Sequence, residues 1–327
     1  MLFGGWASVG VGVVFFCWYY YFHSNSRGGI EKNIMDNIDA DEVCASCGKV
    51  EVDDVKLRKC TACKLVKYCS VECQKIHRPQ HKKACKTRAA EIREETLFTQ
   101  PDESDLGECP ICCLPLPIDY NKHTVKSCCC KRICAGCVYA NKQREIEQGL
   151  EQKCLYCREQ VPKKKEEVVQ NLKKRVKAND PVALFEMGRI CYSEGDYEGT
   201  IQYYTKAAQL GNMEAHYNLS CMYYEGDGVE KDPKKELYHL EEAAIGGHPK
   251  ARHNLGCHED ENGRYDRAMK HWIIAAKFGY DHALDMVKQG FQVGLASKED
   301  FEAALRGHQA AVDATKSEQR DEAYIST

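Results

Sequence analysis

Cysteine is concentrated in one part of this chain more strongly than any other chemically distinctive residue. Seventeen of the twenty-one cysteines lie between Cys44 and Cys157, and five pairs follow the C-x-x-C pattern. A C-x-x-C turn presents two thiolates to one tetrahedral zinc ion at about 2.3 Å each. A disulfide framework instead belongs mainly to small secreted domains, not to a chain of 327 residues. The pattern therefore predicts zinc sites.

The N-terminal segment carries a second strong signal. Residues 2–22 contain no formal charge, and the run ends in a cluster of aromatic side chains. A helix of about 20 apolar residues crosses a hydrocarbon core of about 30 Å, and aromatic rings suit the headgroup layer. We therefore predict a transmembrane helix over residues 1–23. Because Arg27 and Lys32 follow the run and no basic residue precedes it, the positive-inside rule places the rest of the chain in the cytosol.

Two other interpretations of this segment are open. A cleaved signal peptide would show a basic start and a small-residue cleavage site, and neither is clear here. A buried helix would leave the protein soluble in the cytosol. After this segment, a Gly-Gly pair and alternating charges indicate a linker over residues 24–43.

The overall composition narrows the function classes. The net charge is -3 and 29% of the residues are charged, so the chain does not resemble a nucleic-acid binder. The sequence contains no nucleophile elbow, phosphate-binding loop or metalloprotease helix, so nothing supports a conventional hydrolase or transferase. We expect proteins as partners and no nucleic acid.

The first cysteine cluster, residues 44–85, resembles the MYND finger. Its metal-binding candidates in order are Cys44, Cys47, Cys60, Cys63, Cys69, Cys73, His77, His81 and Cys85. A Tyr-Cys dipeptide at Tyr68, the three-residue gap before Cys73 and the closing His-Lys-x-x-Cys carry the resemblance.

The MYND resemblance implies two interleaved zinc ions. One set of ligands is Cys44, Cys47, Cys69 and Cys73, and the other is Cys60, Cys63, His81 and Cys85. Ligands four residues apart lie on one side of a helical turn, as both sets require. So small a fragment buries little core, and we expect zinc to supply most of its folding free energy. The resemblance gives His77 a structural role and implies short proline-containing peptides as partners.

The second cysteine cluster, residues 109–162, has the layout of a RING finger. Its cysteines are Cys109, Cys112, Cys113, Cys128, Cys129, Cys130, Cys134, Cys137, Cys154 and Cys157. The resemblance implies one zinc ion bound by Cys109, Cys112, Cys134 and Cys137. A second ion would be bound by Cys129, a neighbouring cysteine, Cys154 and Cys157. The resemblance also implies that Ile111 contacts a ubiquitin-conjugating enzyme and that Arg158 steadies the thioester-linked ubiquitin.

The middle of this second cluster departs from the family. Lys131 falls at the position of the usual histidine ligand, and a lysine cannot bind zinc at neutral pH. An adjacent cysteine must complete the second site; Cys128 is our candidate, and Cys130 is the alternative. Cys113 has no metal partner in this scheme.

From residue 180 the sequence repeats itself. An Ala-Ala-x-x-Gly block recurs at 207–211, 243–247 and 275–279, at intervals of 36 and 32 residues. Such periods indicate a solenoid of helix pairs, in which small alanines allow close approach and the glycines end each second helix. A tight turn, Gly226-Asp227-Gly228-Val229, and Lys235 lie between two of these blocks. With them the segment 180–290 resembles the Sel-one-like repeat, a relative of the tetratricopeptide repeat.

Three further segments surround these modules. Charged connectors are predicted over 86–108 and 163–179, and a capping helix within 291–316, where Ser297 and Asp300 form a capping box. The polar residues 317–327 are predicted to be a disordered tail.

The predicted fold is therefore mainly α: two small zinc-stabilised fingers followed by an α-solenoid of helix-pair repeats, with an N-terminal hydrophobic helix. The expected cofactor is zinc, about four ions. Two functions fit this organisation. The chain is either a membrane-tethered RING-type ubiquitin ligase that docks its substrate through the MYND finger and repeats, or a zinc-dependent scaffold without ligase activity.

Overall fold

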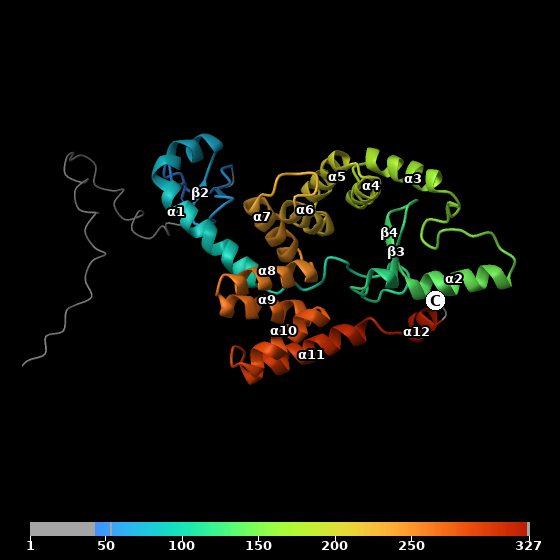
Figure 1. The fold of residues 1–327 in the computed structure, drawn as a ribbon. Helices are drawn as coiled ribbons and strands as arrows, with labels where there is room; N and C mark the ends of the chain where they lie inside the picture. The colour runs from blue at the N-terminus through green and yellow to red at the C-terminus, as the bar shows by residue number, and fades with distance from the viewer. Residues whose placement is uncertain (1–42, 53, 326–327) are drawn as a thin grey trace, which may run out of the picture. The chain divides into compact units, whose positions relative to one another are not determined.

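A computed structural model describes residues 43–52 and 54–325 of the chain (Figure 1). By their internal contacts they form two compact units with a boundary between Ile92 and Arg93, and each is described by itself. The predicted transmembrane helix and nearly all of the predicted linker lie outside the described residues. Within the described part of the chain, no helix is long and apolar enough to cross a membrane.

The first unit contains a small two-stranded sheet and most of a long helix, which crosses the boundary between the units. β1 (Arg58–Lys59) pairs antiparallel with β2 (Lys67–Tyr68), and α1 (Val71–Phe98) follows. Its buried cluster consists of Cys44, Leu57, Cys60, Cys63 and Tyr68. Three of these five side chains are predicted metal ligands, so apolar burial alone gives this unit little stability.

The charged connector predicted over residues 86–108 is helical in its first part. α1 continues to Phe98, because residues 86–96 are rich in Ala, Glu, Lys and Arg, which favour helix. Residues 99–107 contain turns and bends but no helix.

The second unit begins with a second cysteine module, which we define as residues 105–162. It contains η4 (Tyr120–Lys122), the hairpin of β3 (His123–Lys126) and β4 (Lys131–Cys134), and α2 (Ala135–Glu147). In the hairpin His123 lies opposite Cys134. Its buried core is made by Leu106, Cys109, Leu116, Ile133, Cys134 and Cys137.

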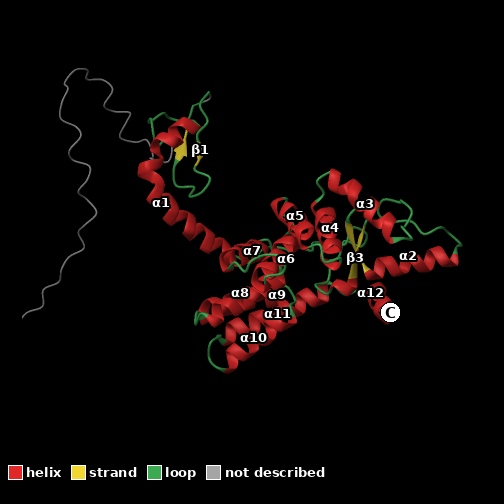
Figure 2. Cartoon of the chain, turned by 45° about the horizontal axis from the view of Figure 1, so that its top comes forward, coloured by secondary structure: helices red, strands yellow, loops and turns green. Residues whose placement is uncertain are grey.

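Nine helices follow as a solenoid (Figure 2). They are α3 (Lys165–Lys177), α4 (Pro181–Ser193), α5 (Tyr197–Gln209), α6 (Met213–Glu225), α7 (Pro233–Ile245), α8 (Pro249–Glu261), α9 (Tyr265–Lys277), α10 (Asp281–Gln292) and α11 (Lys298–Ala314). The predicted helix-pair repeats are confirmed: α4 packs on α5, α6 on α7 and α8 on α9.

The repeated small residues have the roles that their positions predicted. The alanines of the Ala-Ala blocks are buried between the helices. The first turns of the helices that follow these blocks also bury one alanine each: Ala215, Ala251 and Ala283. Gly211, Gly247 and Gly279 follow the ends of α5, α7 and α9 with φ values of 85°, 87° and 90°. This left-handed conformation carries no steric cost in glycine, which explains why the repeat places glycine there.

The predicted disordered tail over 317–327 is wrong for most of its length. Residues Glu318–Ile325 form α12, which packs against α2. Arg320 and Ala323 are buried in this contact although the segment is polar in sequence. Tertiary contacts with the second cysteine module therefore order a helix whose sequence alone gives little support for order.

Candidate metal centres and the surrounding polar clusters

Four groups of side chains each bring four metal-binding atoms to within 4.8 Å of one another. Site 1 is Cys44, Cys47, Cys69 and Cys73; site 2 is Cys60, Cys63, His81 and Cys85; site 3 is Cys109, Cys112, Cys134 and Cys137; site 4 is Cys128, Cys129, Cys154 and Cys157. These groups contain every metal-binding residue that the sequence predicted. Sites 1 and 2 alternate along the chain, as the MYND resemblance implies.

The sulfur separations fit tetrahedral zinc. With bonds of about 2.3 Å, two thiolates of a tetrahedron lie about 3.8 Å apart, whereas a disulfide bond measures about 2.05 Å. Cys47 and Cys69 are 3.6 Å apart at site 1, and Cys60 and Cys85 are 3.8 Å apart at site 2. The corresponding distances are 3.8 Å between Cys112 and Cys134 at site 3 and 3.8 Å between Cys129 and Cys154 at site 4. All four clusters are compatible with zinc.

The two histidines of the first unit have different surroundings. The Nε2 atom of His81 lies 3.2 Å from the sulfur of Cys63, inside site 2. His77 stands one turn earlier on α1, and its Nδ1 atom is 3.0 Å from the hydroxyl of Tyr68. Its ring stacks on His81 at 5.6 Å. His77 therefore lies beside site 2 as a supporting residue, in the role that the resemblance gave it.

The structure separates the three consecutive cysteines of the second module. Cys128 points into site 4, with its sulfur 3.3 Å from that of Cys157. Cys130 has a φ of 55° and packs instead in an apolar cluster with buried Leu172, Ala183 and Met187. The geometry therefore favours Cys128 over Cys130, a choice that the sequence left open.

Four C-x-x-C turns share one backbone geometry that the sequence did not reveal. In each turn the residue after the second cysteine donates its N–H to the carbonyl of the first, at 2.8–3.0 Å. These residues are Gly48, Lys64, Cys113 and Arg158, with φ values of 72°, 58°, 54° and 65°. The left-handed conformation costs roughly 1–2 kcal/mol in a residue with a side chain, and an ion that ties the two cysteines together would offset this cost. Cys113 and Arg158 are thus turn residues, recognisable by their place directly after the second cysteine.

A separate polar cluster joins the second cysteine module to the repeats. Oxygen atoms of Asp105 and Glu214 and the Nε2 atom of His248 lie within 4.8 Å of one another. The Nδ1 atom of His248 accepts a hydrogen bond from the N–H of Ala251 at 3.0 Å, so the neutral ring carries its proton on Nε2. That atom faces Glu214 at 3.4 Å. A metal ion at Nε2 would have to displace this proton, and we therefore interpret the cluster as a buried polar anchor.

Burial and hydrogen bonding together set the pKa values of this anchor. Burial raises the pKa of Asp105 above its usual range. Burial also acts upward on Glu214, but hydrogen bonds from His248 and Tyr120 outweigh it and hold the pKa of Glu214 below its usual value. Burial and the neighbouring Glu214 raise the pKa of Tyr120, so its hydroxyl keeps the proton that it donates.

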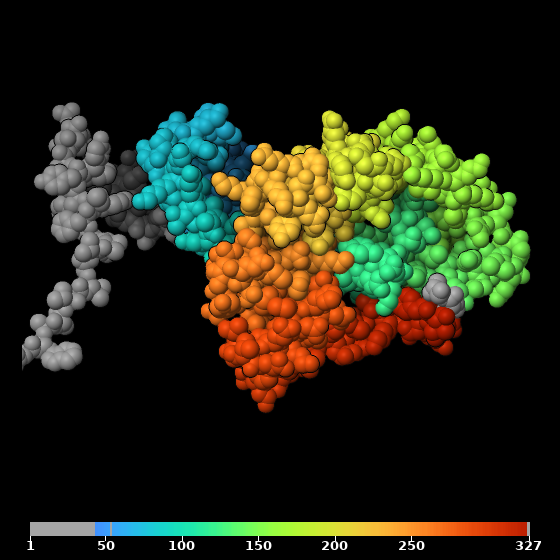
Figure 3. Space-filling model, in the orientation of Figure 1, coloured from blue at the N-terminus to red at the C-terminus, as the bar shows by residue number. Residues whose placement is uncertain are grey.

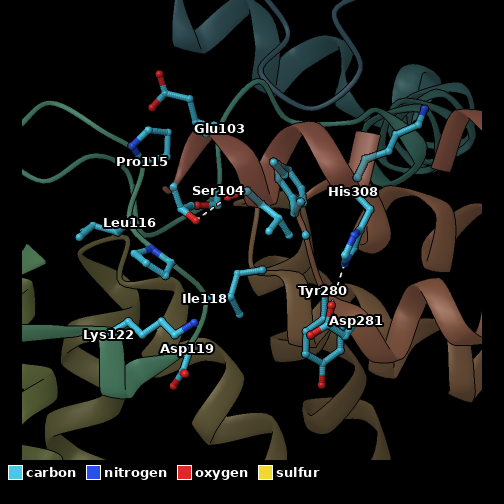
Figure 4. Close-up of a pocket in the computed structure, with 18 of the residues that line it drawn as sticks. Glu103, Ser104, Pro115, Leu116, Ile118, Asp119, Lys122, Tyr280, Asp281 and His308 are labelled. Atoms are coloured by element: carbon cyan, nitrogen blue, oxygen red, sulfur yellow. Dashed lines mark hydrogen bonds and ion pairs between the residues drawn. The ribbon is translucent and has the colours of Figure 1, made fainter. Parts of the chain in front are cut away.

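A pocket of about 830 Å³ lies between the second cysteine module and the last repeats (Figure 4). Residues 115–122 form one wall, and residues 277–282 and 308–315 form another. His308 and Asp281, which also line the pocket, contact each other at 2.8 Å. Acidic side chains such as Asp119 and basic ones such as Lys122 both line the pocket, so its charge does not favour one class of ligand.

The residues that the RING resemblance assigns to a ubiquitin-conjugating enzyme are both exposed. Ile111 lies in the turn of site 3 with 40% of its surface exposed. Arg158 follows site 4 and is exposed as well. Neither side chain contributes to the buried core of the module, so both are accessible to a partner.

Comparison with protein families identifies two of the modules. Residues 44–85 match the MYND finger, and residues 181–212 and 214–248 match the Sel1 repeat, the family described above as Sel-one-like. Among curated proteins, the "Putative beta-lactamase HcpC" of Helicobacter pylori is 39% identical over 56 residues, which cover 17% of this chain and 19% of that protein. The "SET domain and MYND-type zinc finger protein 6" of Schizosaccharomyces pombe is 38% identical over 56 residues, covering 17% of this chain and 11% of that protein.

Solved structures show the same kind of partial similarity. A Sel1 repeat protein from Oxalobacter formigenes is 24% identical with a TM-score of 0.41, covering 55% of this chain and 73% of that chain. The protective antigen c5321 of uropathogenic Escherichia coli, described as having an SLR fold, is 20% identical with a TM-score of 0.38, covering 51% of this chain and 36% of that chain. This chain spans less than one fifth of the length of either curated relative. Its family matches establish that it contains a MYND zinc finger and Sel1 repeats, and so has the parts of a zinc-binding protein-interaction protein.

Proposed function

We propose that this protein is a zinc-dependent adaptor whose second cysteine module recruits a ubiquitin-conjugating enzyme. The MYND finger and the repeats would dock the substrate. The observation that carries the proposal is the placement of Ile111 and Arg158, which project from the turns of sites 3 and 4 and are exposed. A module of this kind performs no bond chemistry itself, because it acts by holding a charged conjugating enzyme in a reactive geometry.

Zinc would hold in place the two turns that carry Ile111 and Arg158. Sites 3 and 4 supply eight cysteine sulfurs, and four thiolates form a closed structural zinc site with no open position for catalysis. We therefore propose zinc at all four sites, with a structural role at each. Metal analysis of the purified full chain should return about four ions, and two or fewer would contradict the assignment of one module.

The test of ubiquitin transfer uses the full chain, because Tyr120 and Cys130 tie the second module to the repeats. The zinc-loaded protein is incubated with ubiquitin, the activating enzyme and a broad panel of conjugating enzymes. We expect ubiquitin chains with at least one enzyme of the panel, and a loss of at least tenfold with Ile111→Ala. Ile146→Ala is the matched control, because Ile146 is also exposed, at 60%, but lies on α2 away from the turns.

A substitution at Arg158 must be compatible with its left-handed backbone conformation. Because its φ is 65°, Arg158→Asn removes the charge while keeping a residue that tolerates the left-handed conformation. We expect this variant to bind the conjugating enzyme but to transfer ubiquitin more slowly. No transfer across the whole panel, with both variants indistinguishable from the unmodified protein, would rule the ligase proposal out.

A non-catalytic scaffold is the second candidate function. Two observations favour it: Lys131 replaces the usual histidine ligand, and α12 packs against α2 of the second module. If the scaffold is correct, a pull-down with the zinc-loaded chain should recover partners that are lost when site 1 is disrupted by Cys47→Ser. Proline-containing peptides are the partner class to test first at the MYND finger.

The membrane anchor is a separate proposal, supported by the uncharged residues 2–22. Full-length protein should stay with membranes during carbonate extraction at high pH. Release into the supernatant would remove the proposal.

A further inference from the structure

The C-terminal helix α12 brings a fully buried arginine to site 3. Arg320 is only 1% exposed, although an arginine is almost never buried without partners. Figure 3 shows the C-terminal segment (red) against the surface of the second cysteine module (green). This contact could not be predicted from the sequence, since Arg320 lies in a polar segment 208 residues after Cys112.

The guanidinium group is held by atoms around site 3. Its Nη1 atom donates to the carbonyls of Pro115 at 2.8 Å and Thr315 at 2.7 Å. Its Nη2 atom donates to the carbonyl of Leu114 at 3.2 Å and to the sulfur of Cys112 at 3.4 Å. The three carbonyls hold the guanidinium group in one orientation. Of these four partners, only the Cys112 sulfur can carry a negative charge.

The charge of site 3 explains why a cation is placed there. Four thiolates and one Zn²⁺ together carry a net charge of about -2, which is costly to bury without compensation. Groups that hydrogen-bond metal ligands orient them and tune the site, and their loss typically reduces metal affinity by about 10–100-fold.

Gly136 on α2 shows that this contact depends on close packing. A Cβ atom at Gly136 would lie 2.8 Å from the Cα and 2.8 Å from the Cγ of Arg320. Glycine inside a helix is less favourable than alanine by roughly 1 kcal/mol, so its presence needs a compensating reason. The approach of α12 provides that reason.

We propose that α12 is an integral part of site 3 and that Arg320 is a positioning residue, which partly neutralises the thiolates, orients Cys112 and slows metal loss. This inference rests on the proposed binding of zinc at site 3. It makes the C-terminal end of the chain necessary for a fully stable metal centre that begins at Cys109.

The test measures metal retention site by site in the full-length zinc-loaded protein. A chelator is added together with an alkylating reagent, and mass spectrometry follows the labelling of each cysteine over time. We expect Arg320→Met to speed labelling of the site 3 cysteines by about 10–100-fold, with sites 1 and 2 unchanged as internal references. Arg320→Lys keeps the charge but not the planar guanidinium group. Its labelling rate at site 3 should lie between those of the unmodified protein and Arg320→Met. Arg306→Met on α11, which removes an exposed cation, is the matched control.

A second variant perturbs the same contact from the opposite side. Gly136→Ala should strengthen α2 by helix propensity alone, yet we expect it to speed metal loss from site 3 because it displaces α12. In a chain that ends at Lys316, the same substitution should no longer accelerate metal loss. Dependence of the Gly136→Ala effect on the presence of α12 would show that it acts through this contact and not through general misfolding.

The outcomes separate the two proposals. If the unmodified protein binds no zinc at site 3, the zinc proposal and this inference both fail. If it binds zinc there and the Arg320 and Gly136 variants release it at the unmodified rate, only the role of α12 is overturned.

Discussion

The hydroxyl of Tyr120 donates to both carboxylate oxygens of Glu214, at 2.6 and 2.7 Å. This contact joins η4 of the second cysteine module to α6 of the repeats, across 94 residues of sequence. Glu214 is 6% exposed, so its carboxylate depends on protein donors instead of water. The second module is thus anchored in the solenoid through a buried charge.

Tyr120→Phe should destabilise the second unit, because it removes one of the donors to this buried carboxylate. The expected loss in the free energy of unfolding is about 1–3 kcal/mol, the usual cost of leaving a buried polar group unsatisfied. Urea denaturation followed by circular dichroism measures it. Tyr224→Phe, on the helix α6 that carries Glu214, is the matched control, since Tyr224 is 65% exposed. Equal effects of the two substitutions would contradict the anchoring role.

Cys128→Ser should lower the zinc content of the protein, whereas Cys130→Ser should not. Cys128 lies within site 4, so its substitution should lower the zinc content by about one ion, because three ligands leave a structural site incomplete. Cys130 packs among apolar side chains, and its substitution should leave the zinc content unchanged while lowering stability modestly. Metal analysis of the two purified variants decides the matter. Loss of zinc from Cys130→Ser alone would reverse the assignment.

His271 should make the repeats sensitive to acid. The ring is 0% exposed, and burial together with Arg252 and Arg267 lowers its pKa to about 3. Above about pH 6.5 the ring is neutral in both the folded and the unfolded chain, so it adds no pH dependence. As the pH falls from about 6.5 towards 3, the unfolded chain binds a proton that the folded chain does not. Stability is then lost at up to about 1.4 kcal/mol per pH unit.

His271→Leu should remove this contribution. Between pH 6.5 and pH 5, the unmodified protein should lose roughly 2 kcal/mol more than the variant. Metal sites also respond to acid, but they are the same in both proteins and cancel in the difference. His282→Leu, at an exposed position on α10, should keep the full pH dependence. Parallel curves for His271→Leu and the unmodified protein would refute the prediction.

Gly256 should tolerate no side chain. A Cβ atom there would overlap the indole Nε1 of Trp272 and lie 2.5 Å from its Cδ1. Trp272 is 3% exposed and donates from Nε1 to the carbonyl of His253 at 3.2 Å, so the ring cannot move without losing contacts. Gly256→Ala should therefore destabilise the repeats by about 1–3 kcal/mol, although alanine favours the helix by roughly 1 kcal/mol.

Gly290→Ala is the comparison for this substitution. Its Cβ atom would meet the terminal methyl of Met269, the far end of a flexible side chain. We expect a change within about 1 kcal/mol of the unmodified protein, because the methionine can adopt another rotamer. Thermal unfolding of the two variants measures the difference in stability. A larger loss of stability for Gly290→Ala than for Gly256→Ala would contradict the prediction that the rigid packing of Trp272 makes Gly256 the more sensitive position.

The metal-binding residues were accessible from the sequence because their geometry is local. Two cysteines three residues apart share one turn, and ligands four residues apart share one side of a helix. The same reasoning holds for the repeats, where Ala207, Ala243 and Ala275 recur at a period set by one pair of helices. Hydrophobic composition also gave the transmembrane prediction, which concerns residues outside the described part of the chain.

The wrong prediction concerns a segment whose state depends on neighbours far away in sequence. The tail after Lys316 was predicted to be disordered from its polarity, but α12 forms because Arg320 and Ala323 are buried against the second cysteine module. The charge of the connector after Cys85 did not by itself indicate that its first part continues α1 as a helix.

The sequence by itself determined the metal-binding chemistry, the two cysteine modules and the repeat architecture. Each of these features depends on spacings of a few residues or on one repeating period. Only the tertiary structure decided that Cys128 lies in site 4, that Tyr120 meets Glu214 and that Arg320 reaches Cys112. The physical reason is that each of these contacts depends on the packing of segments between 29 and 208 residues apart, which no local pattern specifies.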